Sequence, residues 1–281
     1  MEGYALLDSG GGRKLERFGP YIMDRPAAQV LWKRRRPELW EKADARFERV
    51  GDGDGNWSQQ PGLPARWTAR IAGVSFHIAP TPFGHLGVFP EQAPLWEELR
   101  TLVSDARRQG EIKVLNLYAY SGGATLACAR AGAEVVHLDA SRPTVAQARE
   151  NAELSGASGL KIHWVVEDVL AFLKRELKRG HRYQGVVLDP PSFGRGTRGE
   201  VFKIERDVVE VLALAAQLLA PDARFMLLSC HTPGFTPTTL GNLLGNCLPA
   251  KKGSLDCGEM LLSGADALSL PSGTWACWKA S

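Results

Sequence analysis

The chain has 281 residues, of which 44% are hydrophobic and 23% charged, and a formal net charge of +3. This is the composition of an ordinary globular protein, and the length allows one large domain or one domain with a smaller neighbour. The sequence has no apolar run long enough to span a membrane and no signal-peptide pattern, and its bulk charge does not indicate a nucleic-acid binder. We therefore expect a cytoplasmic protein.

Residues 1–80 are rich in glycine, proline, arginine and tryptophan, with short strand-like pieces at residues 21–23 and 69–78. We predict a small β-rich N-terminal extension there. A helix is expected to start at Pro94, and from Glu111 onward strands and helices alternate. The predicted strands are residues 112–117, 134–138, 161–166, 184–188 and 224–229. The predicted helices are residues 124–130, 143–154, 169–179, 207–219 and 236–246.

This alternation predicts an α/β fold, a Rossmann-like and mostly parallel sheet with helices on both faces. Two weak strands near Met260 and Trp275 are expected to add an antiparallel hairpin at one edge. The five cysteines are scattered and include no C-x-x-C pair. We therefore expect reduced thiols, without a disulfide framework or a metal site.

The first strand–helix–strand unit, residues 112–141, carries the clearest functional signal. A glycine turn at Ser121, Gly122 and Gly123 follows the first strand, and Asp139 ends the second. Glycines let a ligand approach the backbone, and an acid at this position can accept hydrogen bonds from both hydroxyls of a ribose. The turn lacks the G-x-G-x-x-G pattern, so a pyrophosphate is not favoured. The alternative is a glycine turn that binds no nucleoside.

Two more acids follow the third and fourth strands, so three acids are expected at one sheet edge. Asp139 suits ribose hydroxyls, Asp168 suits the exocyclic amine of an adenine, and Asp189 suits a polar group near the reaction centre. The structural alternatives are a turn residue for Asp139 and a helix N-cap for Asp168.

Residues 189–193 have the sequence Asp-Pro-Pro-Ser-Phe. Two prolines stiffen a loop and remove two N–H donors. Phe193 is then placed to stack on a base drawn into the site. The alternative is an ordinary Pro-Pro turn with Phe193 in the core.

Three basic clusters could line a phosphate-binding surface if the fold brings them together, although each alone is usually a solvated face. The clusters are Lys33, Arg34, Arg35 and Arg36; Lys174, Arg175, Lys178, Arg179 and Arg182; and Arg195, Arg198, Lys203 and Arg206.

Four segments in combination, VLNLYAYSGGATLACARAGA, HLDAS, Glu167-Asp168 and VVLDPPSF, resemble class I S-adenosylmethionine-dependent methyltransferases. More narrowly, they are similar to the large-subunit ribosomal RNA methyltransferases whose best-known members methylate cytosine C5. The segment GVFPEQ at residues 87–92 also resembles that family. The resemblance covers residues 65–280 and implies a methyltransferase domain over residues 81–281. Residues 1–80, which lie mostly outside the resemblance, are a candidate RNA contact.

The resemblance implies S-adenosyl-L-methionine as the cofactor, with Asp139 on its ribose, Asp168 near its adenine and Asp189 by its amino-acid end. Phe89 and Gln92 would close over it. The expected cofactor-binding residues are Phe89, Gln92, Asn116, Tyr118, Tyr120, Ser121, Gly122, Gly123, Asp139, Ala140, Ser141, Asp168, Val169, Asp189 and Pro190. The expected catalytic residues are Cys230, Asp189 and Phe193.

The role of Cys230 depends on the atom that receives the methyl group. A nitrogen acceptor needs little beyond positioning, whereas cytosine C5 first requires attack at C6, usually by a cysteine thiolate. In the resembling family a Ser-Cys pair at this strand end has that role, and here it is Ser229-Cys230. The alternative is a small buried hydrophobic side chain.

The main hypothesis is a methyltransferase acting on an RNA base, at cytosine C5 or a base nitrogen, with ribosomal RNA as partner. A methyltransferase for a small molecule or protein, and a non-catalytic nucleotide-binding module, remain alternatives. Two features depart from the cytosine-C5 members. Nothing in residues 1–80 resembles their complete N-terminal RNA-binding domain, and Ser192 stands where they usually have lysine.

Overall fold

The computed structural model describes residues 3–50, 54–195, 201–248 and 252–281. The chain forms two compact units. The N-terminal unit comprises Met1–Ala93 and Leu261–Ser272, and the sheet unit comprises Pro94–Met260 and Gly273–Ser281. In the described part of the chain, no helix has both the length and the apolarity that crossing a membrane requires.

The N-terminal unit is built mainly from short strands. A five-stranded sheet has the order β1-β2-β3-β4-β5, antiparallel except between β3 and β4, and β6 pairs with β7. The elements are β1 (Tyr4–Gly10), β2 (Arg13–Phe18), β3 (Tyr21–Pro26), α1 (Pro37–Trp40), β4 (Ala45–Arg49), β5 (Gly55–Gln59), β6 (Trp67–Ile71), β7 (Val74–Ile78) and the 3₁₀-helix η1 (Pro90–Gln92). The predicted β-rich extension is confirmed; the functional division at residue 80 stays a prediction.

One local prediction is wrong. Residues 69–78 are not a single strand-like piece, because they belong to the hairpin of β6 and β7. Ala72 and Gly73 form its turn with φ values of 48° and 78°. The turn shifts the alternation of buried side chains by one residue, from Ile71 to Val74.

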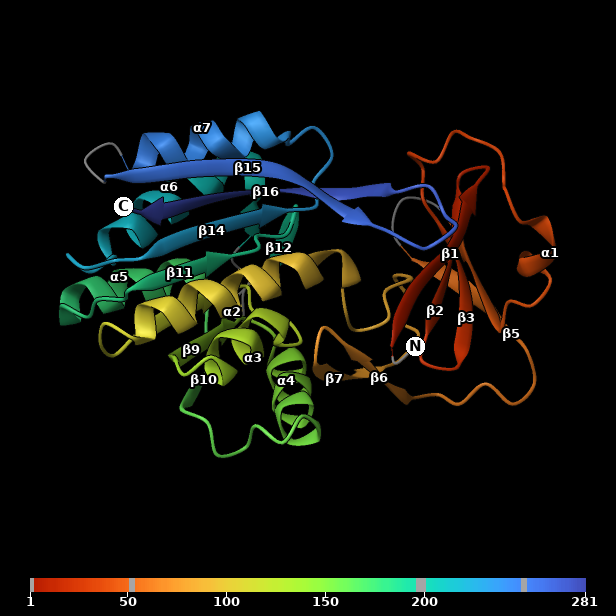
Figure 1. Ribbon diagram of the computed structural model, residues 1–281, viewed down its shortest axis with the longest axis horizontal. Coiled ribbons are helices and arrows are strands. Elements are labelled where there is room, and N and C mark those ends of the chain that lie inside the picture. The colour runs from red at the N-terminus through yellow and green to blue at the C-terminus, as the bar shows by residue number, and fades with distance from the viewer. Residues whose placement is uncertain (1–2, 51–53, 196–200, 249–251) are drawn as a thin grey trace. The chain divides into compact units, whose positions relative to one another are not determined.

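The sheet unit contains the alternating strands and helices (Figure 1). Its elements are α2 (Ala93–Arg107), β8 (Lys113–Leu117), α3 (Gly123–Arg130), β9 (Glu134–Asp139), α4 (Arg142–Leu154), β10 (Ile162–Val166), α5 (Val169–Arg179), β11 (Gly185–Leu188), β12 (Phe193–Arg195), β13 (Val201–Lys203), α6 (Ile204–Gln217), β14 (Phe225–Cys230), α7 (Pro237–Cys247), β15 (Gly253–Leu262) and β16 (Leu270–Ala280). Part of the β15–β16 hairpin, Leu261–Ser272, belongs to the N-terminal unit.

The central sheet has seven strands in the order β10-β9-β8-β11-β14-β16-β15. Strands β8, β9, β10, β11 and β14 are parallel, and β16 is antiparallel to β14. Figure 1 shows β14, β16 and β15 side by side at one edge. The chain moves outward from β8 to β10 and then returns to β11 on the other side of β8. Ligands bind at such a switch point, beyond the carboxyl ends of the strands. The predicted fold class is confirmed.

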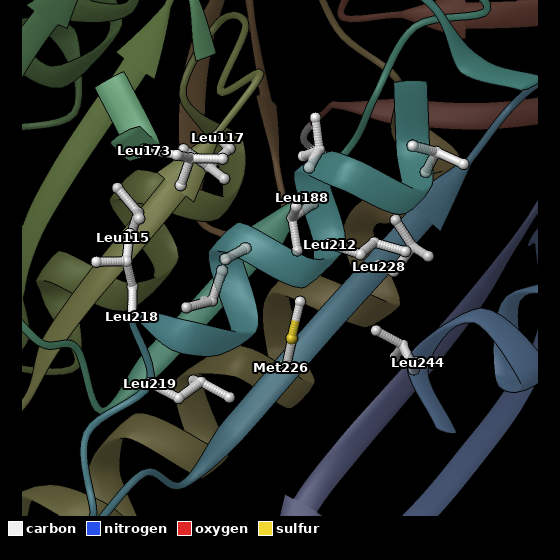
Figure 2. Packing of buried hydrophobic residues seen from close by; sticks show 14 of the residues in the cluster. Leu115, Leu117, Leu173, Leu188, Leu212, Leu218, Leu219, Met226, Leu228 and Leu244 are labelled. Carbon is white, nitrogen blue, oxygen red and sulfur yellow. The ribbon is translucent and has the colours of Figure 1, made fainter. Parts of the chain in front are cut away.

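Each face of this sheet has its own apolar core. Leu115 and Leu117 point to one face, where they pack with side chains from α5, α6 and α7 (Figure 2). Val114 points to the other face, where α2 and α3 cover the sheet. The period of two along β8 therefore places helices on both sides, as the alternation of elements predicts.

Candidate functional site

The strand registers bring the predicted strand-end residues to one edge. Leu117 at the end of β8 lies opposite Leu138 of β9 and Leu188 of β11. Leu188 in turn lies opposite Leu228 of β14, and Asp139 lies opposite Val166 of β10. The segments after these strands, residues 118–123, 139–141, 168–169, 189–193 and 229–230, therefore meet along the carboxyl edge.

The turn after β8 has an unusual backbone. Tyr118, Tyr120 and Gly122 have φ values of 55°, 48° and 92°. Positive φ strains a tyrosine, and such strain persists where surrounding contacts impose it. Here the Tyr120 N–H donates to Asp139 Oδ2 at 3.1 Å, and the Ala119 N–H donates to the Leu138 carbonyl at 3.0 Å. The end of β9 thus fixes the shape of this turn.

Asp139 connects the turn after β8 with the segment after β9. Its Oδ1 accepts a 2.9 Å hydrogen bond from the Ser141 N–H. Burial raises the pKa of Asp139, although the hydrogen bonds from Ser141 and Tyr120 act in the opposite direction. Each carboxylate oxygen can accept two hydrogen bonds, and each takes one from the backbone described above. The two carboxylate oxygens can therefore each accept one further hydrogen bond, which fits the two hydroxyls of a ribose.

Residues 140 and 141 continue this edge. Ala140 is partly exposed between Asp139 and Ser141. Ser141 caps α4, because its Oγ accepts hydrogen bonds from the N–H of Thr144 at 3.4 Å and from its hydroxyl at 2.7 Å. The cap fixes the backbone that follows Asp139.

Gly123 is required by packing against α2. A Cβ at this position would lie 2.2 Å from Cζ2 of Trp96. We expect Gly123→Ala to lower the free energy of unfolding by about 1–3 kcal/mol, the usual effect of overpacking. Chemical denaturation measures this difference. Gly159→Ala is the matched control, because no atom lies within 4 Å of a Cβ there; equal stability of the two variants would contradict the packing argument.

Asn116 lies beneath the edge rather than at it. Its side chain is 3% exposed, and its amide donates to Thr125 Oγ1 at 2.8 Å. Thr125 Oγ1 also lies 2.8 Å from His137 Nδ1. Burial and the charge of Arg149 lower the pKa of His137 to about 3, so the imidazole is neutral. Thr125 and His137 were not among the predicted site residues, although a histidine inside an apolar strand could have indicated them. Ser121 is buried, and its carbonyl accepts from Asn151 Nδ2 at 3.0 Å.

Asp168 is a helix N-cap, the structural role that was the alternative to binding an adenine. It caps α5, because its Oδ1 accepts a 2.9 Å hydrogen bond from the Ala171 N–H. Its Oδ2 accepts none from the part of the chain that the structure describes. Capping therefore leaves an acceptor at the edge for an amine. The side chain of Val169 is 3% exposed and belongs to the core.

Asp189 lies at the end of β11 in a polar group. Ser229 Oγ donates to Asp189 Oδ1 at 2.8 Å, and His231 Nδ1 lies 3.4 Å from the same oxygen. Pro190 is buried. Further along the loop, Ser192 Oγ lies 2.7 Å from Thr232 Oγ1. The loop is therefore tied to the end of β14, and the sequence analysis missed the pairing of His231 with Asp189.

Phe193 and Tyr118, two of the four aromatic residues predicted for the site, differ in exposure. Phe193 is 51% exposed, so it does not lie in the core as the Pro-Pro turn alternative requires. It is the first residue of β12, opposite Lys203 of β13. Tyr118 packs with Phe202 at 5.5 Å between ring centroids, and burial raises the pKa of its phenol.

Cys230 is the last residue of β14 and is 1% exposed. Its Sγ accepts a 3.4 Å hydrogen bond from the Thr232 N–H. Burial raises the pKa of this thiol, so the resting site holds it protonated and enclosed. These properties fit the alternative role of Cys230, a small buried hydrophobic side chain, better than that of a reactive thiolate. Its role as a nucleophile stays a prediction.

Residues 98–247 match the family model described as S-adenosylmethionine-dependent methyltransferase, which covers more than half of the chain. The chain belongs to this family. A crystal structure of an S-adenosylmethionine-dependent methyltransferase from Agrobacterium tumefaciens is similar over 100% of this chain and 91% of that one, with 36% identity and a TM-score of 0.93. The predicted family and its cofactor, S-adenosylmethionine, are thus confirmed.

Two curated relatives match shorter parts of the methyltransferase. Ribosomal RNA large subunit methyltransferase I of Aeromonas salmonicida is 34% identical over 119 residues, which are 42% of this chain and 30% of that protein. Ribosomal RNA large subunit methyltransferase K/L of Syntrophotalea carbinolica is 34% identical over 158 residues, which are 56% of this chain and 21% of that protein. The matches thus span less than a third of these relatives.

Two predicted cofactor contacts lie in the N-terminal unit. Phe89 precedes η1, with its ring centroid 5.2 Å from that of His85, and Gln92 ends η1. Their closure over the cofactor stays a prediction.

Two of the three basic clusters lie mainly at different ends of their helices. The Lys174–Arg182 cluster runs from the middle of α5 to the loop beyond its end, at the amino edge, whereas Lys203 and Arg206 lie at the start of α6, beside the carboxyl edge. Arg198 lies outside the described residues.

Proposed function

We propose that the protein transfers the methyl group of S-adenosylmethionine to a base of ribosomal RNA. The observation that carries this proposal is the presence of two groups at one sheet edge, on either side of β8: Asp139 with the turn that it holds, and the Asp189 loop with its exposed Phe193. The names of the curated relatives support RNA as the acceptor. When bound, the cofactor supplies an electrophilic methyl group on a sulfonium.

The proposed cofactor contacts follow from the carboxylate acceptors at this edge. Asp139 accepts hydrogen bonds from the ribose hydroxyls, and Asp168 accepts one from the adenine amine through its remaining oxygen. The backbone of residues 120–123 borders the cofactor, with Asp189 and Pro190 by its amino-acid end.

The acceptor base is held by the loop after β11. Phe193 stacks on the base, since an exposed ring on a stiff loop offers a flat face. Asp189 accepts an N–H of the acceptor nitrogen and so orients its lone pair, with Ser229 and His231 fixing the carboxylate. As the nitrogen bonds to the methyl carbon, the sulfonium–carbon bond would break, and the proton that the nitrogen loses would pass to the Asp189 carboxylate. Transfer then requires the acceptor about 3–3.5 Å from the methyl carbon.

A base nitrogen suits this site better than cytosine C5. Attack at C6 needs a thiolate, and Cys230 is enclosed with a raised pKa. Cytosine C5 is the second candidate, because Cys230 lies next to Ser229, which contacts Asp189.

Replacing Cys230 by alanine distinguishes a base nitrogen from cytosine C5 as the methyl acceptor. With a nitrogen acceptor we expect turnover within about tenfold of the parent enzyme, since the change only removes a small buried side chain. Steady-state methyl transfer to RNA measures it, with cofactor affinity as the control for folding. Turnover lost entirely at unchanged cofactor affinity would contradict the nitrogen acceptor and establish Cys230 as the nucleophile.

A basic segment of the N-terminal unit is the proposed RNA contact. The buried carboxylate of Asp8 accepts hydrogen bonds from the N–H groups of Arg35 at 3.3 Å and Arg36 at 3.0 Å. It also accepts one from Trp40 Nε1 at 2.8 Å. This anchor leaves the side chains of Lys33 and Arg35 exposed. A segment held in this way presents cations to phosphates at little entropic cost.

The double variant Lys33→Ala/Arg35→Ala tests this contact without disturbing Arg34, which stacks on Trp40. We expect weaker RNA binding and a plot of log affinity against log salt that is shallower by about 1 to 2. The control, Arg108→Ala/Lys161→Ala, removes the same charge from exposed positions of the sheet unit. Identical salt slopes in the two variants would place the RNA elsewhere.

The two alternative functions predict different results. A non-catalytic module would bind RNA but give no heat with S-adenosylmethionine in calorimetry. A methyltransferase for a small molecule or protein would bind the cofactor but leave RNA unlabelled.

A further inference from the structure

A cavity of about 380 Å³ lies at the amino edge of the sheet, opposite the proposed methyl-transfer site. Lys113 and Glu134 begin β8 and β9, and His163 lies near the start of β10. The end of α5 and the loop before β11 complete its wall. The cavity extends along the sheet to Val165, near the end of β10, and to Phe172 in the first turn of α5. It includes none of the residues proposed to bind the cofactor or the acceptor base, so it is a separate site.

The lining is predominantly cationic. Four cationic side chains face two carboxylates, and they come from β8, from α5 and from the loop before β11; they are Lys113, Arg175, Arg179 and Arg182. A basic residue at the C-terminal end of a helix interacts favourably with the helix macrodipole, and this explains Arg179 at the end of α5. It does not explain Lys113 and Arg182, which lie outside that helix.

Glu176 organises the centre of this lining. Its side chain is 5% exposed, and Oε2 accepts hydrogen bonds of 2.7 Å from both Tyr183 Oη and His181 Nδ1. Oε1 lies 3.4 Å from Arg179. Glu176 therefore positions the cation of Arg179. Lys113 Nζ lies 3.9 Å from Glu134 Oε1, whereas Arg182 donates to the His181 carbonyl and to no carboxylate of the described residues.

Arg175 supplies a donor that lacks an acceptor. Its guanidinium pairs with Glu167, but its Nε is buried and has no hydrogen-bond partner among the described residues. Buried donors are nearly always paired, so an unpaired one at a cavity indicates a missing acceptor. Beside it, Val136, Val165 and Phe172 form an apolar wall.

We infer that this cavity binds the phosphate of a nucleotide, with the sugar or base against the apolar wall. The volume lies within the range of about 300–1,000 Å³ of ligand sites. Guanidinium groups match phosphate oxygens in charge and geometry. The nucleotide is either free or part of an RNA chain, since both carry the same group.

Calorimetry with inorganic phosphate, AMP and a short single-stranded RNA tests the site. The variant Arg179→Ala/Arg182→Ala removes two cations of the cavity. The control Lys174→Ala/Lys178→Ala removes two exposed cations of the same sequence cluster that do not line it. We expect the first variant to lose at least about tenfold in affinity, since charge-assisted hydrogen bonds are lost, and the control to change less than about threefold.

The probe whose affinity falls in the first variant shows whether the bound phosphate belongs to a free nucleotide or to an RNA chain. Loss of AMP affinity indicates a free nucleotide, and loss restricted to RNA indicates a phosphate within the chain. The absence of binding by the parent protein to all three probes, or equal losses in both variants, would overturn the inference. S-adenosylmethionine affinity is expected to stay unchanged in both variants, so a failure here is distinguishable from a failure of the proposed function.

Discussion

Replacing Asp139 by alanine is expected to lower the affinity for S-adenosylmethionine by about two orders of magnitude or more. The change removes both proposed acceptors of the ribose hydroxyls, and a hydrogen bond to a charged group contributes about 1.5–3 kcal/mol. It also releases the Tyr120 N–H, which the carboxylate holds at 3.1 Å in a turn with positive φ. Isothermal titration calorimetry measures the loss.

Asp139→Asn is the graded control for this prediction. One oxygen remains in the asparagine side chain, so we expect an affinity between those of the parent and the alanine variant. Circular dichroism establishes that both variants fold. An alanine variant that is folded and binds the cofactor within about threefold of the parent would show that the ribose is held elsewhere.

Replacing Asp189 by alanine is expected to reduce methyl transfer by about a thousandfold, the middle of the range for a positioned acid–base group. The change removes the carboxylate that accepts from Ser229 Oγ at 2.8 Å and pairs with His231 Nδ1 at 3.4 Å. Because it acts on the acceptor base, we expect a larger effect on turnover than on cofactor affinity. Single-turnover kinetics with saturating cofactor measure the chemical step.

Ser229→Ala is the matched control for Asp189. It removes one hydrogen bond to the carboxylate and retains the acid, so we expect a loss of about tenfold. Equal rates for the Asp189 and Ser229 variants would indicate that the group acts only by supporting the loop. A loss of cofactor affinity as large as the loss of turnover would assign Asp189 to the cofactor alone.

Most elements of the sheet unit were predictable because their patterns are local; the short strands β12 and β13 were not predicted. Helix α5 has the predicted bounds, Val169–Arg179, since Asp168 caps its start and Gly180 ends it in a left-handed conformation. The N-terminal unit was less predictable. Its strands are short. The turn at Ala72 and Gly73 interrupts a run of alternating apolar residues that reads as one strand. The inclusion of Leu261–Ser272 in that unit depends on contacts between distant residues, such as Leu6 with Leu262.

The placement of the acids was predictable for a topological reason. Parallel strands share a carboxyl edge, so strand order alone brings Asp139, Asp168 and Asp189 together. The partners of these acids were not predictable, because side-chain contacts between strands depend on register. The pairing of Asp189 with His231 and the burial of Cys230 are of this kind.

Mass spectrometry of nucleosides from ribosomal RNA, treated with the protein and methyl-labelled S-adenosylmethionine, tests the central claim most directly. We predict one labelled nucleoside that carries the methyl group on its base, and its loss when Asp189 is replaced by alanine. RNA without label, in a preparation that binds the cofactor, would contradict the proposed function.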